Sequence, residues 1–282
     1  MRKRIAFAGL PARERMSFVE ELGARIEAAD SVVSVGLDPD MERLPEDVQD
    51  AELPRWAFNR RIIDATHEHA AVFKPNAAFY EDSDGWRALR ETVAYAHGKG
   101  VPVLLDAKRA DIGNTARQYA EILAHVDAIT VNPYLGEDAL QPFLTQDEAG
   151  VFVLCRTSNE GGMDFQHLEL AAYDRRLYEH VAERAAEWNA QYGDVGLVVG
   201  ATAPDELQAI RERVPELPFL VPGVGAQGGD AEAAVEYGLN DDGVGLVNST
   251  RGVIFAGEHG SAWAAAAGDA ARTLRERLNR HR

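Results

Sequence analysis

The chain has 282 residues, of which 46% are hydrophobic and 27% charged, enough apolar material for the core of one large domain or two small ones. Its net charge of -17 excludes nucleic acid and anionic lipid as natural partners, because both would repel it, and no stretch approaches the ~20 apolar residues that span a membrane. A single cysteine, Cys155, excludes an internal disulfide and indicates a reducing compartment, the cytoplasm.

The expected elements, in chain order, begin with a helix over residues 16–30. Short apolar runs rich in β-branched residues then recur eight times, and we expect each to be a strand: 31–37, 70–75, 101–107, 127–132, 150–156, 195–201, 217–223 and 243–249. Segments of helical period or composition separate these runs, such as 86–100 and 173–193.

The alternation of apolar strands with helices predicts a parallel sheet covered by helices on both faces. Eight such units in roughly 250 residues predict an α/β fold, a closed (β/α)8 TIM barrel, with the helix at 16–30 as an extra N-terminal helix that closes the barrel bottom. A doubly wound open sheet is the alternative. No linker or break in composition divides the chain, so residues 1–282 are expected to form a single barrel domain.

The acidic charge is spread along the whole chain, and only four lysines stand against twenty-five arginines. A spread acidic surface stays soluble in strong salt, where screening suppresses its self-repulsion, so this composition predicts a protein from a salt-adapted organism. Lys74 and Lys108 each end an apolar run. Since arginine supplies the ordinary surface charge here, these two lysines are expected to have specific roles.

The stretch LLDAKRADIGNT places Asp106, Lys108 and Asp111 within six residues at the end of an apolar run. Residues i and i+2 of a strand share a face, and barrel enzymes keep their active sites at the C-terminal ends of the strands. The structural alternative is an ion pair at the rim. Asp38 and Lys74, which end the first two strands, complete an alternating set of acids and lysines and favour a reaction site.

The stretch PGVGAQGGD contains Gly223, Gly225 and Gly228, which match G-x-G-x-x-G. A dinucleotide fingerprint follows the first strand of its unit, whereas this motif follows the seventh. We therefore predict a phosphate cradle, to which Arg251 after the eighth strand adds a charge-assisted contact. Plain glycine turns and a surface arginine are the alternative.

The loop after the fifth strand, CRTSNEGG, offers Ser158 and Asn159 among small residues, as a polar lid over a ligand would. A plain loop is the alternative. Cys155 is expected to pack in the barrel wall, because no histidine is placed to activate it. The eight histidines show no metal-ligand spacing, so no metal site is predicted.

Several motifs, taken together in chain order, resemble those of one known family. They are GLD (36–38), FKPN (73–76), D-x-K-x-x-D-I-x-N-T (106–115), NPYLGEDAL (132–140), TSN (157–159), PGVGAQGGD (222–230) and STRG (249–252). The set resembles the orotidine 5′-phosphate decarboxylases, particularly their longer bacterial and archaeal subgroup, over residues 31–256. The resemblance implies decarboxylation of orotidine 5′-monophosphate to uridine 5′-monophosphate without a cofactor, the last step of de novo pyrimidine biosynthesis.

The same resemblance implies roles at the reacting centre. Lys108 would protonate C6 of the pyrimidine as carbon dioxide leaves, and Asp106 would lie against the departing carboxylate. Lys74 and Asp38 would complete the charge array and hold the ribose hydroxyls. Chemistry agrees with these roles, because the carbanion left at C6 lies in the ring plane, where the π system cannot delocalise it, and preorganised charge must stabilise it.

The resemblance also implies an assembly. Asp111, with Ile112 and Thr115, would reach into the neighbouring subunit's site. The expected protein is therefore a homodimer with shared active sites.

The remaining implied contacts are those of Ser158 with the pyrimidine and of Gln227 and Arg251 with the phosphate. Two other functions fit part of the pattern. A 3-keto-sugar-phosphate decarboxylase or an aldolase would share the phosphate cradle and D-x-K-x-x-D, but would need magnesium or a Schiff-base lysine. A non-catalytic barrel would bind uridine monophosphate and leave orotidine monophosphate unchanged.

Overall fold

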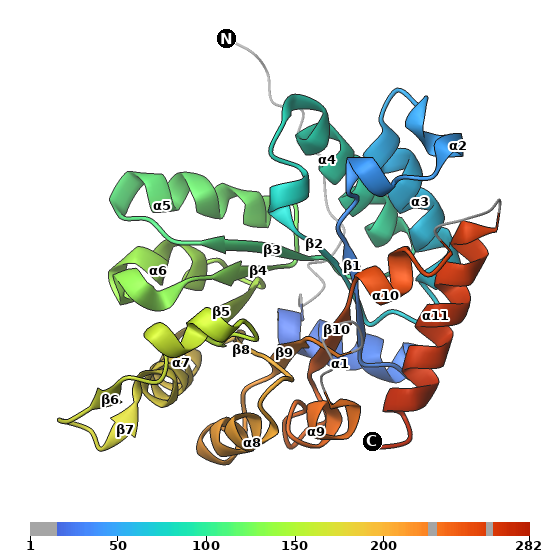
Figure 1. Cartoon of the computed structure of the whole chain (residues 1–282). Coiled ribbons are helices and arrows are strands. Elements are labelled where there is room, and N and C mark those ends of the chain that lie inside the picture. The colour runs from blue at the N-terminus through green and yellow to red at the C-terminus, as the bar shows by residue number, and fades with distance from the viewer. Residues whose placement is uncertain (1–15, 225–229, 258–261) are drawn as a thin grey trace, which may run out of the picture.

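The computed structural model describes residues 16–224, 230–257 and 262–282, in which strands and helices alternate (Figure 1). The strands are β1 (Val33–Leu37), β2 (Val72–Pro75), β3 (Leu104–Arg109), β4 (Ala128–Val131), β5 (Gly150–Arg156), β6 (Glu169–Leu170), β7 (Arg175–Arg176), β8 (Val195–Val199), β9 (Phe219–Pro222) and β10 (Leu246–Ser249). The α-helices are α1 (Phe18–Ala29), α2 (Glu46–Gln49), α3 (Pro54–Thr66), α4 (Ser83–Gly98), α5 (Gly113–Ala120), α6 (Glu137–Leu144), α7 (Leu177–Tyr192), α8 (Pro204–Arg213), α9 (Ala231–Glu236), α10 (Arg251–Ile254) and α11 (Trp263–Leu278). Short 3-10 helices are η1 (Met41–Arg43), η2 (Ala77–Phe79), η3 (Glu121–Ala124), η4 (Pro133–Leu135) and η5 (Glu160–Asp164).

Eight parallel strands form one sheet in the order β2-β1-β10-β9-β8-β5-β4-β3, and each of the eight apolar runs supplies one of them. The two end strands meet through parallel bridges that join Phe73 to Val103 and Asn76 to Asp106. These bridges close the sheet into a barrel surrounded by helices (Figure 1). The predicted (β/α)8 barrel is confirmed, and the alternative of an open doubly wound sheet is wrong, because an open sheet would leave β2 and β3 apart.

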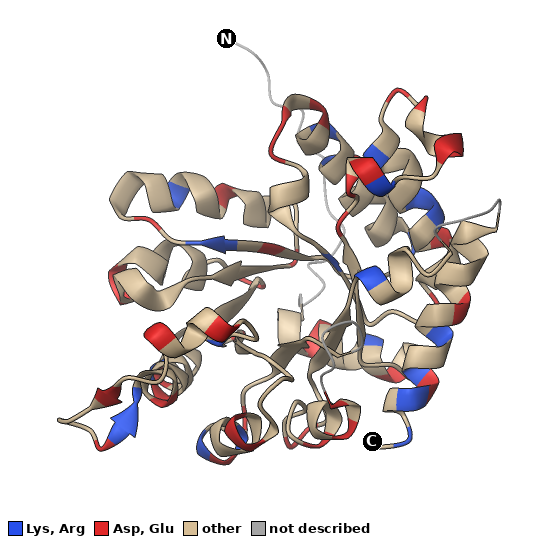
Figure 2. Ribbon diagram, in the orientation of Figure 1, with Lys and Arg blue, Asp and Glu red and all other residues tan. Residues whose placement is uncertain are grey.

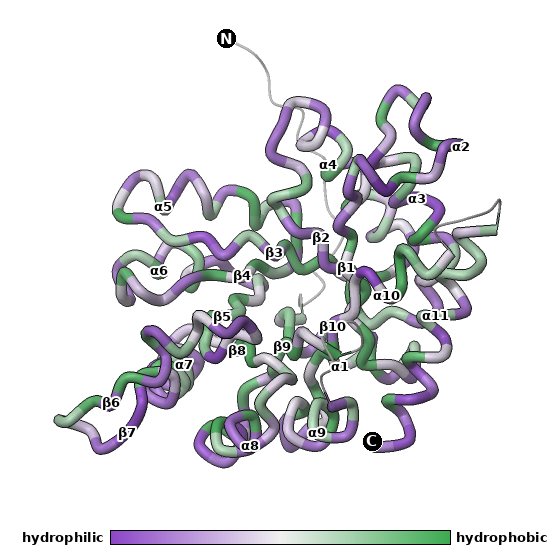
Figure 3. The backbone as a smooth tube through the Cα atoms, viewed as in Figure 1, coloured by the Kyte–Doolittle hydropathy of each residue, from purple (hydrophilic) through white to green (hydrophobic). Residues whose placement is uncertain are grey.

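The strands are buried on both sides, since side chains fill the barrel and helices cover its outside. All five residues of β1 and all five of β8 are buried. Figure 3 shows this pattern as barrel strands that are mostly green or white, apart from the purple end of β3, with most purple on the surrounding helices and loops. A continuous apolar run therefore indicated a strand here because neither face of the sheet meets water.

The extra N-terminal helix is α1, and it covers the bottom of the barrel as predicted. Ser17 caps it, accepting a hydrogen bond from the Glu20 backbone while the Glu20 carboxylate accepts one from the Ser17 backbone. Phe18 packs edge to face on Phe152 of β5, with 6.0 Å between ring centroids. A backbone N–H of α1 donates to Asp194, which immediately precedes β8. These contacts attach α1 to the N-terminal ends of the strands.

The helix expected over residues 173–193 is α7, but it begins at Leu177. The residues before it form an antiparallel hairpin between Glu169–Leu170 and Arg175–Arg176. The prediction was therefore wrong for its first four residues. Their charged side chains suggested a helical surface, whereas Arg175 instead extends from the hairpin to form an ion pair with Glu183 on α7.

Charged residues lie mainly on the outer helices and loops and on the small β6–β7 hairpin, and the strands of the barrel carry few of them apart from β3 (Figure 2). In the part of the chain that the structure describes, no helix has the length and apolar character needed to cross a membrane. The charges on β3 are therefore the exception that requires a local explanation.

Candidate active site

Asp106 and Lys108 lie at the C-terminal end of β3, where the strand departs from regular geometry. The register between β3 and β4 shifts between Leu105 and Arg109, and Lys108 has a φ of 48°. A positive φ is unfavourable for a residue with a side chain, so other contacts must hold this conformation. The ammonium of Lys108 lies 2.6 Å from Oδ1 of Asp106. The predicted proximity of the pair is confirmed, although an irregular strand end produces it.

Lys74 reaches the same carboxylate from the neighbouring strand. Lys74 lies on β2, two residues before Asn76. Asn76 forms one of the two bridges to β3 that close the barrel, and its partner there is Asp106. Lys74 Nζ lies 2.9 Å from Asp106 Oδ2, so each carboxylate oxygen receives one ammonium group. The exposed fraction of the side chain is 5% for Lys74, 12% for Asp106 and 47% for Lys108. Lys108 is therefore the ammonium that a ligand at the barrel mouth can reach.

The environment keeps these buried groups charged. Burial alone would raise the pKa of the Asp106 carboxyl, but the ammonium groups of Lys74 and Lys108 outweigh it and hold this pKa well below its usual range. Burial alone would lower the pKa of the Lys74 ammonium, but the carboxylates of Asp106 and Asp38 outweigh it and raise this pKa. Asp106 and Lys74 therefore present fixed charges at the buried end of the array, and the half-exposed Lys108 lies at its mouth.

Thr130, in the middle of β4, is a member of the site that sequence reasoning missed. Its hydroxyl donates to Asp106 Oδ1 over 2.9 Å and accepts from the Lys108 backbone N–H over 2.9 Å. The signal available in the sequence was a polar residue inside the otherwise apolar run that follows the run of Asp106. That signal does not identify the partner, because threonine is common in strands.

Asp38 follows β1 and connects the charge array to the neighbouring cavity. Burial raises the pKa of its carboxyl, although the ammonium of Lys74 opposes this rise. Its Oδ1 atom is buried and has no hydrogen-bond partner among the described residues. A buried carboxylate oxygen without a donor is costly, so a ligand hydroxyl that donates to Asp38 would be favoured here.

A cavity of about 440 Å³ opens beside Asp38, between the loops that follow β1, β9 and β10. It is lined by Asp38, Asp40, Arg43, Phe79, Pro222, Gly223, Val224, Asn248, Ser249, Thr250, Arg251, Gly252 and Phe255. Gly223 has a φ of 107°, which favours glycine, and Arg251 is exposed at the cavity. Gln227, Gly225 and Gly228 lie outside the described residues. Gly223 and Arg251, two residues of the predicted phosphate cradle, therefore line the same cavity, and phosphate binding there stays a prediction.

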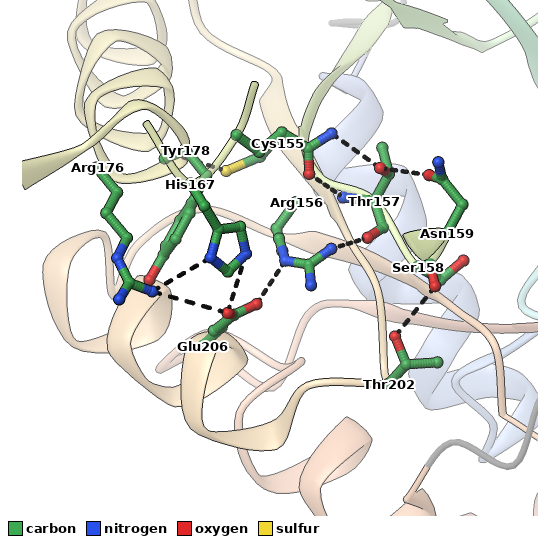
Figure 4. A network of polar contacts seen from close by, with 11 residues as sticks. Cys155, Arg156, Thr157, Ser158, Asn159, His167, Arg176, Tyr178, Thr202 and Glu206 are labelled. Atoms are coloured by element: carbon green, nitrogen blue, oxygen red, sulfur yellow. Dashed lines mark hydrogen bonds and ion pairs between the residues drawn. The ribbon is translucent and has the colours of Figure 1, made fainter. Parts of the chain in front are cut away.

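Ser158 lies in the loop after β5, next to a network of polar contacts (Figure 4). A side chain at Gly200 would come within 2.9 Å of Ser158, so glycine there lets the two loops approach closely. The loop that contains Ser158 is held by Arg156, whose side chain bonds to the Thr157 carbonyl and to Glu206 on α8. Cys155 is buried in the wall, as expected, and its burial raises the pKa of its thiol.

Asp111, Ile112 and Thr115 are not brought to the charge array of their own chain. Among the described residues, no hydrogen bond or ion pair joins Asp111 to Lys74 or Lys108, and its Oδ1 accepts from the Ile112 backbone. Ile112 is 62% exposed, and Thr115 is exposed as well. Ile112 and Thr115 therefore lie on the surface of this chain, and Asp111 is half-buried beside them.

Comparison with known proteins identifies the family. The profile of the orotidine 5′-phosphate decarboxylase / HUMPS family matches residues 31–266. Orotidine 5′-phosphate decarboxylases of two halophilic archaea, Halorubrum lacusprofundi and Natronomonas pharaonis, are 70% and 68% identical over 278 and 275 residues, which cover 95% of this chain and 100% of each relative. The predicted origin in a salt-adapted organism is thereby confirmed. The solved structure of Leishmania donovani OMP decarboxylase is 42% identical with a TM-score of 0.80, covering 94% of this chain and 98% of that chain. The chain belongs to the orotidine 5′-phosphate decarboxylase / HUMPS family.

Proposed function

We infer that this chain decarboxylates orotidine 5′-monophosphate to uridine 5′-monophosphate, the last step of de novo pyrimidine biosynthesis. The observation that carries this inference is the Asp106 carboxylate held between Lys74 and Lys108 at the barrel mouth. Arg251 lines the cavity next to this array, at a position suited to a phosphate. The named relatives, which the chain covers along their whole length, support the same reaction.

Lys108 is the proton donor of the proposed mechanism. Loss of carbon dioxide leaves an electron pair at C6 in the plane of the ring, where the π system does not stabilise it. An ammonium fixed beside C6 lowers the energy of this developing anion and then transfers a proton to it. Lys108 suits this role because it is the exposed lysine of the array, and the bond to Asp106 limits its motion.

Asp106 and Lys74 set the charge around the departing group. The depressed pKa of Asp106 keeps it ionised, so it repels a substrate carboxylate placed against it. That repulsion disappears as neutral carbon dioxide leaves, which favours the reaction relative to the bound substrate. Lys74 holds Asp106 in place and compensates its charge. The proposed mechanism thus relies on protein charges alone, without a cofactor.

Asp38 and the cavity bind the remainder of the nucleotide. The unpartnered Oδ1 of Asp38 accepts a ribose hydroxyl, with Lys74 beside it. Arg251 binds the phosphate together with Gln227, and Ser158 contacts the pyrimidine from the loop after β5. The phosphate is far from the bond that breaks. The free energy of phosphate binding can still orient the substrate and so raise the rate.

The active protein is proposed to be a homodimer with shared active sites. Asp111 lies apart from the array of its own chain, and the exposed apolar side chains of Ile112 and Tyr134 offer surface for a partner at the barrel mouth. In such a two-fold assembly, Asp111, Ile112 and Thr115 of each chain contribute to the other chain's site. We also propose that residues 1–282 form a single domain and that the protein works in the cytoplasm, as its single cysteine supports.

A spectrophotometric assay tests the function directly. Purified protein should consume orotidine 5′-monophosphate, followed by its loss of absorbance, at the same rate with and without a chelator. Binding of uridine monophosphate without turnover would instead indicate a non-catalytic barrel. Magnesium-dependent turnover of a 3-keto-sugar phosphate, or borohydride trapping with a sugar phosphate, would indicate the rival chemistry.

A further inference from the structure

The hydroxyl of Thr130 is buried between two groups of the charge array. Thr130 is 1% exposed, and it lies on β4, next to β3 in the sheet. Its Oγ1 atom is 2.9 Å from the Asp106 carboxylate and 2.9 Å from the Lys108 backbone nitrogen. No other side chain among the described residues forms hydrogen bonds with both Asp106 and the backbone of Lys108.

The direction of both hydrogen bonds follows from the chemistry of the groups. The Lys108 N–H can only donate, so the Thr130 oxygen accepts from it. The ionised carboxylate of Asp106 can only accept, so the hydroxyl proton of Thr130 points to Oδ1. The Thr130 hydroxyl thus acts as an acceptor and as a donor at once. A side chain without a hydroxyl would leave the Lys108 N–H without this acceptor and Asp106 Oδ1 without this donor.

We propose that Thr130 is a positioning residue that aims the ammonium of Lys108 at the reacting carbon. This proposal rests on the proposed function, in which Lys108 delivers the proton. Lys108 holds a φ of 48°, and the bond from its N–H to Thr130 supports this unfavourable conformation. The same hydroxyl fixes Oδ1, the oxygen that the Lys108 ammonium contacts at 2.6 Å. Thr130 therefore holds the backbone of Lys108 directly and its ammonium indirectly, through Oδ1 of Asp106.

This arrangement predicts an effect on the chemical step and little effect on binding. The cavity proposed for the phosphate is built by loops after β1, β9 and β10, whereas Thr130 acts at the ends of β3 and β4. Loss of the hydroxyl would let the ammonium of Lys108 and the carboxylate of Asp106 drift from the reactive geometry. Small misplacements of this kind reduce rates by up to about 100-fold.

The test compares Thr130→Val, which keeps the shape and removes the hydroxyl, with Thr130→Ser, which keeps the hydroxyl. In Thr130→Val, kcat for orotidine monophosphate should fall about 10- to 100-fold, while KM and the Kd of uridine monophosphate change by less than about 3-fold. Thr130→Ser should restore kcat to within about 3-fold of the wild type. Thr66→Val is the matched control, because Thr66 is as buried as Thr130, and the one hydrogen bond of its hydroxyl within the described residues goes to the Ile62 carbonyl in α3.

Three outcomes would overturn the proposal. The first is an unchanged kcat in Thr130→Val, and the second is a Thr130→Ser variant as slow as Thr130→Val. The third is a rise in KM and a fall in product affinity, in Thr130→Val, as large as the fall in kcat. If Thr130→Val does not fold, Thr130→Ala replaces it, and failure of both to fold would assign Thr130 to stability. Lys108→Ala in the same assay separates the two hypotheses: normal turnover there refutes the proposed role of Lys108, whereas an inactive Lys108→Ala beside a normal Thr130→Val refutes only the role of Thr130.

Discussion

Replacement of Lys74 by methionine removes one charge of the array and keeps an unbranched side chain that is one atom shorter. Lys74 Nζ lies 2.9 Å from Asp106 Oδ2, and both side chains are largely buried. At an effective dielectric constant of about 20, two unit charges at this separation attract each other by about 6 kcal/mol. Desolvation offsets part of this attraction, and removal of one partner of a buried pair costs about 3–5 kcal/mol. Since Lys108 still faces the other oxygen, we expect the lower end, about 3 kcal/mol.

Urea unfolding at several pH values measures this loss, and its pH dependence has a definite sign. The folded-state pKa of Asp106 is depressed, so its stabilisation is present above its unfolded pKa of about 3.9 and is lost as pH falls toward the folded value. The folded-state pKa of Lys74 is raised, so its own contribution persists through neutral pH and is lost only in strong base. The difference between wild type and Lys74→Met should thus be full at pH 6–8, about 3 kcal/mol, and shrink below about pH 4.

Catalysis should respond to the same change. If the whole of this interaction energy is lost from the stabilisation of the transition state, about 3 kcal/mol corresponds to roughly a 150-fold fall in kcat/KM. Lys99→Met is the matched control, because Lys99 pairs with Asp64 at 2.7 Å on the surface, where such pairs contribute about 0–1 kcal/mol. A Lys74→Met variant no less stable than Lys99→Met, or a stability difference that stays constant down to pH 3, would refute the reasoning.

Four further predictions follow from the site and the charge. Lys108→Ala should abolish turnover while product binding is retained, and near-normal activity would refute the proposed mechanism. Arg251→Ala should reduce kcat/KM far more for orotidine monophosphate than for orotidine, which lacks the phosphate, and equal losses would show that Arg251 does not bind phosphate. Stability should be higher in 2 M than in 50 mM potassium chloride, since screening relieves the repulsion within a net charge of -17, and thermal unfolding that shows the reverse would contradict this. Mixed Lys108→Ala and Asp111→Ala chains, each inactive alone, should recover about a quarter of wild-type activity after subunit exchange, because each mixed dimer has one intact shared site; recovery near zero despite exchange would place Asp111 in its own chain's site.

The sequence was sufficient to predict the barrel. Eight apolar runs with no polar alternation require burial of both faces, and helices between them supply the cover, so the strands and their parallel arrangement follow from the hydrophobic pattern. The number of units favoured a closed barrel over an open sheet, and the bridges between the two end strands decided it. The N-terminal helix was also predictable, since its apolar residues recur at helical spacing behind the Ser17 cap. The hairpin at Arg175–Arg176 was not, because charged residues are compatible with a helix or with an extended edge, and contacts with α7 decide between them.

The sequence also predicted that Asp106 and Lys108 lie together, because residues two apart on a regular strand share a face, but the contact forms at an irregular strand end where Lys108 has a φ of 48°. The sequence also named Lys74 as a member of the site, but only the tertiary structure decided its contact with Asp106 and added Thr130. Lys74 meets Asp106 because closure of the barrel brings β2 against β3, and Thr130 meets both because the register of β4 sets its hydroxyl beside them. Closure of the barrel and the register between strands depend on how all the strands pack together. A pattern of residues within one strand therefore cannot predict them.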